Sequence, residues 1–294
     1  MSLLSQATHG REEQPLTVLL YGPAGIGKST FAAGADSPVF IGKRIDLERI
    51  DAAKLPEPTD LSGVYECIEA LRTEKHDYAT LAIDPLTYWL EPMIHRHICK
   101  RDNKPDIRAY GWGDGYRAAV DEWRILLSHL ERLRAERNMA IVLIAHAGTT
   151  KIKPPDSESY NRYAPDLDIR AAALLERWCG EVLFADRKRS MILGDDERYR
   201  ATSDGAAVVH TQWSASFNAK SRLGLPRELP LAHLWQALAP VPVEQLREEV
   251  SQLMSDLSDA DAAKAGDMRS RAGDDAAKWR QLRGWCQAKI QIAA

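Results

Sequence analysis

The chain has 294 residues, of which 45% are hydrophobic and 28% are charged, and its formal net charge is −3. This size and composition are typical of a soluble globular protein that buries one large core and carries an appendage. The slightly acidic balance excludes a protein that is basic overall, so any nucleic-acid-binding surface must be local.

Signals for export, membrane insertion or disulfide formation are absent from the printed sequence. The cysteines are scattered without a C-x-x-C pair, which is typical of a reduced intracellular protein. No apolar run approaches the roughly 18 residues of a membrane span. The first residues lack the basic and then apolar regions of a signal peptide. We therefore expect a cytoplasmic protein with no membrane partner.

The first chemical landmark follows a polar stretch at 1–14 and an apolar run at 16–21, which is expected to form a buried strand. A glycine-rich segment comes next, with the sequence Gly22-Pro23-Ala24-Gly25-Ile26-Gly27-Lys28-Ser29-Thr30. It matches G-x-x-x-x-G-K-[ST] without a mismatch, and the alanine-rich residues after it can open a helix. Strand, glycine loop and helix together predict a P-loop.

The residue types of this loop suit a bound triphosphate. Glycines without a Cβ let backbone N–H groups approach the phosphate oxygens, and the helix that follows adds its own free N–H groups and positive dipole end. Lys28 supplies a mobile positive charge for the β- and γ-phosphates. The Ser29 hydroxyl is expected to ligate Mg²⁺, with Thr30 behind it. Residues 22–30 are thus the predicted binding site for Mg²⁺ and ATP.

The second landmark is a strand predicted at 78–84, which ends in Asp84 and is stopped by Pro85. Between it and the P-loop lie a short apolar run at 38–42, which predicts another parallel strand, and helical apolar spacing over 61–75. Carboxyl ends of parallel strands share one edge of a sheet, so Asp84 is expected beside the P-loop as a second Mg²⁺ ligand. This is the Walker B pattern.

Two loops combine cations with aromatic rings and are candidates for binding single-stranded nucleic acid. The first, at 100–114, follows a helix predicted at 86–100, and the second, at 149–165, is expected to lack secondary structure. Their candidate contacts are Lys100, Arg101, Lys104, Arg108, Trp112, Lys151, Lys153 and Arg162. For the first loop, an ordinary surface loop with Trp112 tucked beneath it is an equally good interpretation.

Two further positions are candidates for contact with a γ-phosphate. His146 ends a strand predicted at 139–146, at the same sheet edge, where it could sense the phosphate or be an inert strand-end histidine. Lys220 and Arg222 lie two apart on an extended segment and so point the same way. They could reach the γ-phosphate of a neighbouring subunit, although spacing alone favours a pair of solvent-facing charges.

The composition shifts after the predicted core. The last core elements are a helix and three short strands, at 166–178, 181–185, 190–193 and 206–213. Pro240 and Pro242 then mark a linker, and helical patterns cover 244–257 and 274–292. We therefore divide the chain into a flexible tail at 1–14, a nucleotide-binding domain at 15–239 and a helical C-terminal appendage at 240–294.

Five separated segments recur in the same order in a known group of proteins. They are Gly-Pro-Ala-Gly-Ile-Gly-Lys-Ser-Thr from Gly22, Ala-Ile-Asp-Pro-Leu-Thr from Ala82, Ile-Ala-His from Ile144, the stretch from Tyr160 to Phe184, and Ala-Lys-Ser-Arg-Leu-Gly-Leu-Pro from Ala219. On these segments, residues 14–238 resemble the phage-type nucleotide-binding proteins with a RecA-like core, which include phage single-strand-annealing recombinases. The appendage lies outside the resemblance.

The resemblance implies an α/β fold, a RecA-like P-loop NTPase core with a mostly parallel central sheet. It implies that subunits form a homo-oligomeric ring or filament with ATP at their interfaces. It implies that Lys220 and Arg222 act on the nucleotide of the neighbouring subunit. With Lys28, Asp84 and His146, which the residue patterns indicate, they complete the expected catalytic residues. It also implies that the loops at 100–114 and 149–165 line a path for single-stranded DNA. ATP would then support annealing or strand exchange of phage DNA inside a bacterial host cell.

One position departs from this group, which usually carries a water-polarising glutamate just after the second strand. Arg44 occupies the aligned position, although Asp46 or Glu48 could substitute. ATP binding is therefore a firmer expectation than ATP hydrolysis, which could be slow. Two other functions stay open: a replication-associated P-loop NTPase such as a helicase loader or motor, and a nucleotide-gated assembly protein with little hydrolysis.

Overall fold

The computed structural model of the chain describes residues 14–188, 190–193, 199–202, 205–239, 243–273 and 276–293. Of the predicted tail, only residue 14 is among them, and the predicted linker at Pro240 and Pro242 lies outside the described residues.

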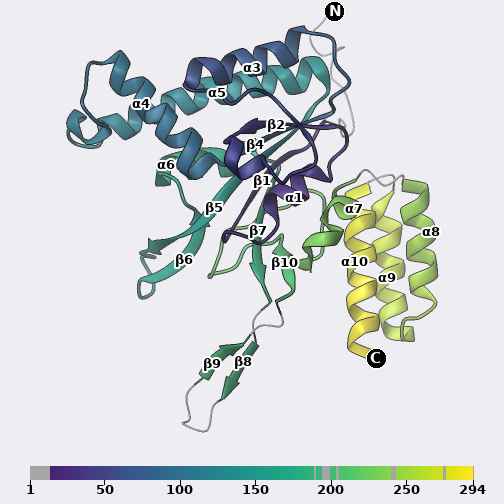
Figure 1. Cartoon of the computed structure of the whole chain (residues 1–294). Helices are drawn as coiled ribbons and strands as arrows, with labels where there is room; N and C mark the ends of the chain where they lie inside the picture. Colours follow the sequence, from purple (N-terminus) through teal and green to yellow (C-terminus); the bar gives the residue numbers. More distant parts are fainter. Residues whose placement is uncertain are drawn as a thin grey trace, which may run out of the picture.

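The core is a mostly parallel sheet with the P-loop strand in its interior (Figure 1). Its strand order is β11-β10-β7-β1-β5-β4-β2-β3, and β6 pairs with the far end of β5. The strands are β1 Thr17–Gly22, β2 Pro38–Gly42, β3 Ala53–Lys54, β4 Thr80–Asp84, β5 Ala140–Ile152, β6 Tyr160–Pro165, β7 Glu181–Arg187, β10 Ala207–His210 and β11 Glu228–Pro230. The pairings from β7 through β3 are parallel, whereas β10 runs antiparallel to β7 and β11. The predicted P-loop core with a mostly parallel sheet is thereby confirmed.

Helices cover both faces of the sheet, which explains why its central strands are apolar at every position. On β1, Leu19 and Tyr21 pack into one hydrophobic cluster, while Val18 and Leu20 pack into the other. The first cluster is covered by α3 Leu61–Thr73, α4 Glu91–Arg101, α5 Asp114–Arg137 and α6 Ile169–Trp178. The second is covered by α1 Lys28–Ala33, α2 Arg44–Leu47 and α7 Leu234–Leu238. A π-helical turn, Leu86–Leu90, leads from β4 into α4.

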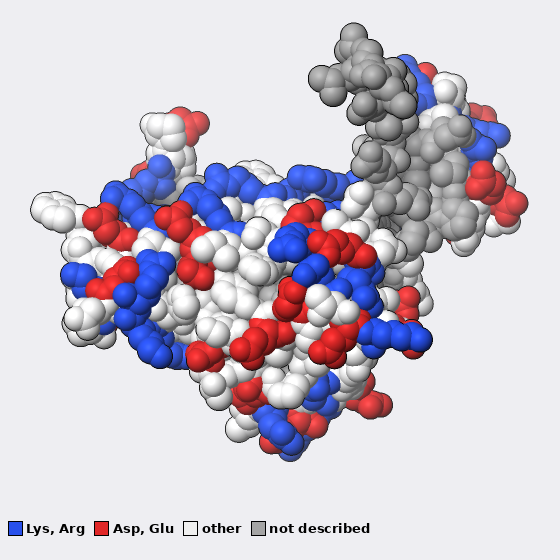
Figure 2. Space-filling view, turned by 90° about the horizontal axis from the view of Figure 1, so that it is seen from above, with Lys and Arg blue, Asp and Glu red and all other residues white. Residues whose placement is uncertain are grey.

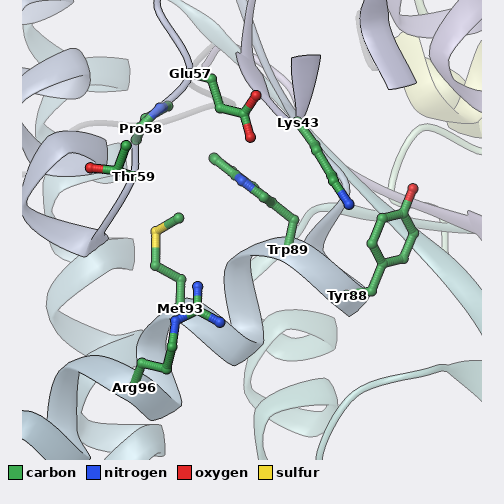
Figure 3. Close-up of a pocket in the computed structure, with 8 residues that line it drawn as sticks. All are labelled: Lys43, Glu57, Pro58, Thr59, Tyr88, Trp89, Met93 and Arg96. Carbon is green, nitrogen blue, oxygen red and sulfur yellow. The ribbon is translucent and has the colours of Figure 1, made fainter. Parts of the chain in front are cut away.

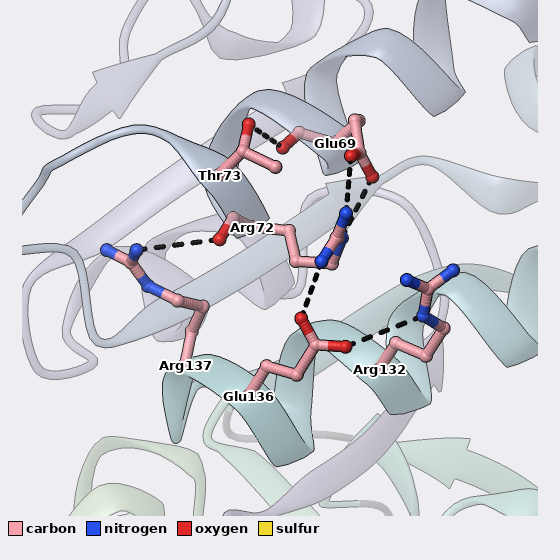
Figure 4. A network of polar contacts seen from close by, with 6 residues as sticks. All are labelled: Glu69, Arg72, Thr73, Arg132, Glu136 and Arg137. Atoms are coloured by element: carbon pink, nitrogen blue, oxygen red, sulfur yellow. Dashed lines mark hydrogen bonds and ion pairs between the residues drawn. The ribbon is translucent and has the colours of Figure 1, made fainter.

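A polar network joins α3 to α5 at the surface (Figure 4). The Arg72 guanidinium donates to both carboxylate oxygens of Glu69, at 2.9 and 2.6 Å, and to Glu136 on α5 at 2.6 Å. Arg132 lies 3.5 Å from the same Glu136 carboxylate, and Arg137 donates to the backbone oxygen of Arg72 at 3.5 Å. The acidic partners are largely exposed, so the network aligns the two helices more than it stabilises them.

The helical face that carries α3 and α5 has mixed charge. Figure 2 views the molecule from this side and shows basic and acidic residues interspersed over it. Along α5 the charges form pairs three residues apart: Arg117 with Asp114, Arg124 with Asp121, and Arg134 with Glu131. Because these cations are already neutralised by neighbours, this face is a poor candidate for a nucleic-acid surface.

The structure corrects the expectation that 149–165 lacks secondary structure. β5 continues beyond the sheet to Ile152 and returns as β6, with paired residues from Ala147 opposite Pro165 to Ile152 opposite Tyr160. The threonines and tyrosines of this segment favour extended backbone, which explains why it forms a β-hairpin. Figure 1 shows the hairpin projecting from the body of the sheet.

A second hairpin leaves the core between β7 and β10 (Figure 1). Its strands are β8 Ser190–Leu193 and β9 Tyr199–Thr202, which pair antiparallel with each other. The strands predicted at 181–185 and 190–193 are confirmed in β7 and β8, and the strand predicted at 206–213 is shorter, β10 Ala207–His210.

The C-terminal residues form three helices, α8 Val243–Met254, α9 Asp259–Ala272 and α10 Ala276–Ala293. Their buried residues make a cluster of their own: Leu246, Val250, Ala265, Ala272, Trp279, Leu282 and Cys286. The sequence predicted the first and last helix but not α9, whose start is capped by the Ser258 hydroxyl accepting from the backbone N–H of Asp261. The domain division at residue 239 stays a prediction. Among the described helices, none is long and apolar enough to cross a membrane.

Candidate functional site

Residues 22–30 form the turn between β1 and α1 that the motif predicts. Gly25 and Gly27 have φ angles of 71° and 104°, in the left-handed region that side chains with a Cβ rarely adopt. A Cβ on Gly22 would lie 2.4 Å from the backbone oxygen of Ala185 on β7. The loop therefore requires glycine for two reasons: its backbone adopts left-handed φ angles, and the neighbouring strand leaves no space for a Cβ.

Lys28 folds back over the loop. Its Nζ donates to the backbone oxygens of Gly22 at 3.0 Å and Pro23 at 2.9 Å, and the residue is only 6% exposed. Burial lowers the pKa of Lys28 to about 8, against the opposing effect of the Asp84 carboxylate. The amine is held over the phosphate-binding turn by carbonyl groups, which are weaker partners than phosphate oxygens.

Ser29, in the first turn of α1, meets Asp84 at the end of β4 although β1 and β4 are not neighbours in the sheet. β5 lies between β1 and β4, and the Ser29 Oγ donates to the Asp84 Oδ2 at 2.5 Å. Burial raises the pKa of Asp84 to about 6; the Ser29 hydrogen bond and Lys28 oppose the rise, and Asp46 adds to it. A hydroxyl and a carboxylate oxygen are ligands that Mg²⁺ accepts.

These two oxygens fit a metal that completes its shell elsewhere. In the described part of the chain, no group of three or more histidine, cysteine or acidic side chains could hold a metal ion. Mg²⁺ usually takes one or two protein oxygens and fills its remaining positions with substrate phosphates and water. The pair Ser29 and Asp84 therefore suits Mg²⁺ bound together with a nucleotide.

His146 connects the P-loop edge to the β5–β6 hairpin. Its register partner on β1 is Gly22, and its ring lies 5.3 Å from the Tyr88 ring. Its backbone N–H donates to the Thr87 hydroxyl at 2.9 Å, and its backbone oxygen accepts from Asp166 at 2.8 Å. Burial lowers the pKa of the imidazole, which favours its neutral form. The structure thus places His146 between the P-loop edge and the hairpin, and its role as a phosphate sensor stays a prediction.

The short helix α2 carries the acid closest to the site. The Arg44 side chain is exposed, whereas Asp46 is partly buried and lies near enough to raise the pKa of Asp84. Burial raises the pKa of Tyr88, and the nearby Asp46 carboxylate adds to the rise. The Oδ2 atom of Asp46 is buried and has no hydrogen-bond partner among the described residues. Glu48, the other alternative, is exposed.

The helix α7 packs against the P-loop helix α1, a contact that the sequence did not predict. The Trp235 ring on α7 stacks on Phe31, with 4.5 Å between ring centroids, and its Nε1 donates to the Phe31 backbone oxygen. Leu231, just before α7, approaches the loop at Gly27, where an added Cβ would meet it at 3.4 Å. Only the general apolarity of 231–238 hinted at this packing.

The first predicted nucleic-acid loop is partly helical. Arg101 ends α4 and pairs with Asp102 at 2.7 Å, and Lys104 lies over the Tyr110 ring at 5.8 Å. Trp112 is 97% exposed and has a φ of 43°, so it is not tucked beneath the loop. The candidate side chains that stay exposed without such a contact in the described part of the chain are Lys100, Arg108 and Trp112.

The candidates of the second loop lie on different faces of the hairpin. Lys151 is opposite Asn161 and Thr150 is opposite Arg162, so the Lys151 and Arg162 side chains point to opposite faces. Lys151 and Lys153 are exposed, whereas Arg162 is half-buried. The hairpin therefore exposes two lysines and not a cluster of three cations.

Lys220 and Arg222 lie at the sheet edge opposite their own P-loop. Lys220 exchanges two backbone hydrogen bonds of 2.8 Å with Val182 near the start of β7, and its Nζ donates to the Glu176 backbone oxygen at 2.5 Å. The Arg222 backbone N–H donates to Glu181 at 2.9 Å, and its side chain is exposed. Because β7 runs parallel to β1, its start lies away from the P-loop, so these cations do not serve the nucleotide site of their own chain.

Comparisons with known proteins give one family match and one similar solved structure. Residues 14–223 match the family described as AAA domain. No curated protein matches the chain. Among solved structures, the crystal structure of the RadB recombinase is similar with a TM-score of 0.38 and 13% sequence identity, over 67% of this chain and 80% of that chain.

Asp84 gives the site a testable pH dependence. A carboxyl with its pKa raised to about 6 keeps its proton at a higher pH than an ordinary aspartate, and the protonated form cannot hold Mg²⁺. The Mg²⁺-dependent part of nucleotide affinity should therefore fall about tenfold for each pH unit below that value. Titration of a fluorescent ATP analogue, with and without Mg²⁺ across this range, measures it.

The control for this titration is Asp84→Asn. The nucleotide itself also titrates, and that contribution is the same for both proteins. The variant should show little Mg²⁺-dependent affinity at any pH. A wild-type Mg²⁺ effect that stays constant through this range would contradict the assignment of Asp84.

Proposed function

The chain belongs to the AAA domain family, and on this premise we propose that it binds Mg²⁺ and ATP, binds single-stranded DNA and acts in phage or prophage recombination. The observation that carries the proposal is the position of His146. It lies level with Gly22 of the P-loop and at the root of a hairpin that exposes Lys151 and Lys153. A change in the phosphates bound at the P-loop can thus be transmitted through His146 to the two exposed lysines of the hairpin.

Each residue of the nucleotide site has a distinct role in this proposal. The backbone N–H groups of 22–30 and the Lys28 amine bind the phosphates. Ser29 and Asp84 would hold Mg²⁺, which supplies positive charge against the phosphate oxygens when bound. Asp46 accepts a hydrogen bond from the attacking water, because its buried Oδ2 is an acceptor with no partner among the described residues.

The DNA partner is supported by charge and exposure. Lys151 and Lys153 on the hairpin, Lys100 in the last turn of α4, and Arg108 and Trp112 between α4 and α5 are exposed. Cations that track a backbone and aromatic rings that stack on bases are the usual combination in proteins that bind single strands. The recombination role follows from the resemblance of the five sequence segments to phage-type nucleotide-binding proteins.

An oligomer is supported by the placement of Lys220 and Arg222. Both lie at the edge opposite their own P-loop, where the exposed Arg222 guanidinium can reach the nucleotide of an adjacent copy. A head-to-tail contact of this kind builds a ring or a filament, depending on whether the rotation closes.

The alternative functions differ from this proposal in what the purified protein does. A helicase-like motor would unwind duplex DNA. A nucleotide-gated assembly protein would form rings or filaments with ATP and release no phosphate. DNA-stimulated phosphate release without unwinding favours the recombinase.

Lys28→Ala tests whether nucleotide governs DNA binding. Loss of charge-assisted hydrogen bonds of about 1.5–3 kcal/mol should weaken ATP binding roughly tenfold to a hundredfold and abolish nucleotide-dependent DNA binding. Fluorescence anisotropy of a labelled single-stranded oligonucleotide, with phosphate release measured in parallel, reports both. Lys75→Ala, which removes an exposed lysine after α3, is the matched control. Unchanged DNA binding by Lys28→Ala would separate the DNA surface from the nucleotide site.

Asp46→Asn tests the proposed water-positioning acid. We expect phosphate release to fall by about two orders of magnitude or more, while ATP affinity stays within a few-fold of wild type. The control is Arg44→Ala on the same short helix, which should leave the rate nearly unchanged because that side chain is exposed. Equal rates for Asp46→Asn and wild type would exclude this role.

A mixing experiment tests the action of Arg222 on a neighbouring subunit. Arg222→Ala and Lys28→Ala should each be inactive in phosphate release when assayed alone. In a random mixture, about a quarter of the interfaces combine an intact P-loop with an intact Arg222 from the other variant, so activity should return. A mixture as inactive as its components would place Arg222 outside the neighbour's site.

A further inference from the structure

A cavity of about 510 Å³ lies beside the nucleotide site, between the segment that precedes α3 and the helices that follow β4 (Figure 3). Its inner wall is apolar and consists of Pro58, Trp89 and Met93, all of them buried. Figure 3 shows the Trp89 and Met93 side chains extending into the space. A pocket of this size holds a small planar ligand such as a nucleobase.

The rim of the cavity is predominantly cationic. Lys43, which follows β2, places its Nζ 5.3 Å from the centre of the Tyr88 ring, and Arg96 projects from α4 (Figure 3). Among the described residues, neither cation has an acidic partner within ion-pair distance. Glu57 is the acid at the rim, and its carboxylate already accepts the backbone N–H of Arg44 at 2.9 Å. An anionic ligand would therefore meet available cations here.

The cationic rim continues along α4. Arg96 and Lys100 are four residues apart and both exposed, so they lie on one face of the helix, about 6 Å apart at their Cβ atoms. This face leads from the cavity to the loop that carries Arg108 and the exposed Trp112. A polyanion that entered the cavity would have further cations along its path.

Tyr88 is shared by the cavity and the nucleotide site. Its ring forms part of the cavity wall and is 44% exposed. The same ring lies 5.3 Å from His146, and the Asp46 carboxylate lies near enough to add to the rise that burial causes in the pKa of Tyr88. A ligand stacked on Tyr88 would therefore contact a side chain that lies beside both His146 and Asp46 of the nucleotide site.

We propose that this cavity binds one unstacked base of single-stranded DNA, with the flanking phosphates on Lys43 and Arg96. The aromatic and thioether wall accepts the face of any base, and the rim cations accept backbone phosphates without reading sequence. The inference rests on the proposed function for its DNA partner, but it names a site outside both loops that the sequence indicated. Through Tyr88 the two sites are coupled, and because coupling is reciprocal, ATP strengthens DNA binding by the same factor by which DNA strengthens ATP binding.

The test is oligothymidylate binding by Lys43→Ala/Arg96→Ala. We expect an affinity loss of about tenfold or more and a salt dependence weakened by about two phosphate contacts, as followed by anisotropy. The control, Lys75→Ala/Arg124→Ala, removes the same two residue types from the α3–α5 side and should bind within about twofold of wild type. Photo-crosslinking with a 5-iodouracil oligonucleotide should yield an adduct on Tyr88 or Trp89, identified by mass spectrometry.

Tyr88→Phe separates the base contact from the coupling. It keeps the ring and removes only the hydroxyl that faces Asp46, so the ratio of the DNA affinities measured with and without ATP should fall to about one. Wild-type binding to DNA combined with unchanged binding by Lys43→Ala/Arg96→Ala, and no adduct on Tyr88 or Trp89, would overturn the inference and leave the proposed function standing. Failure of the wild-type protein to bind any single strand, with or without ATP, would overturn both.

Discussion

The Ser29 hydroxyl lies 2.5 Å from the Asp84 carboxylate, and the geometry of the whole candidate site depends on this contact. Ser29 opens the helix that follows β1, and Asp84 ends β4, on the other side of β5, so they meet only if β1 and β4 end near the same level of β5. The register provides this alignment, since Gly22 is level with His146 on β5 and Asp84 is level with Gly42 on β2. Parallel pairing thus brings the P-loop, the acidic strand end and the acid of α2 to one edge of the sheet.

The site buries charged side chains, and their loss of hydration has an unfavourable free energy. Burial lowers the pKa of Lys28 and raises that of Asp84, and Asp46 has a buried oxygen without a partner in the described part of the chain. Groups in this condition are common at functional sites, where a ligand supplies the missing partners. A triphosphate with Mg²⁺ would give Lys28 an anion and Asp84 a cation, so binding would relieve the cost that folding imposes.

The P-loop is held from two sides. On one side Gly22 packs so closely on β7 that a Cβ would meet the Ala185 backbone oxygen at 2.4 Å. On the other, Trp235 stacks on Phe31 of the helix that opens the loop. A loop fixed in this way presents its backbone N–H groups with little loss of freedom on binding. Because the P-loop itself is fixed, we expect the conformational change on nucleotide binding to occur in the β5–β6 hairpin and around Tyr88.

The sequence alone determined the P-loop, the acid at the end of β4 and the parallel core, because these depend on local residue patterns and on a rule that strand ends share an edge. It also indicated which segments carry cations and aromatic rings. Tertiary structure decided the rest. Only strand pairing shows that 149–165 is a hairpin with Lys151 and Arg162 on opposite faces, and only the turn of α2 shows that Asp46 lies toward the site while Arg44 is exposed. The cavity beside Tyr88 is built from three separate segments, at Lys43, 57–59 and 88–96, whose approach no local pattern records.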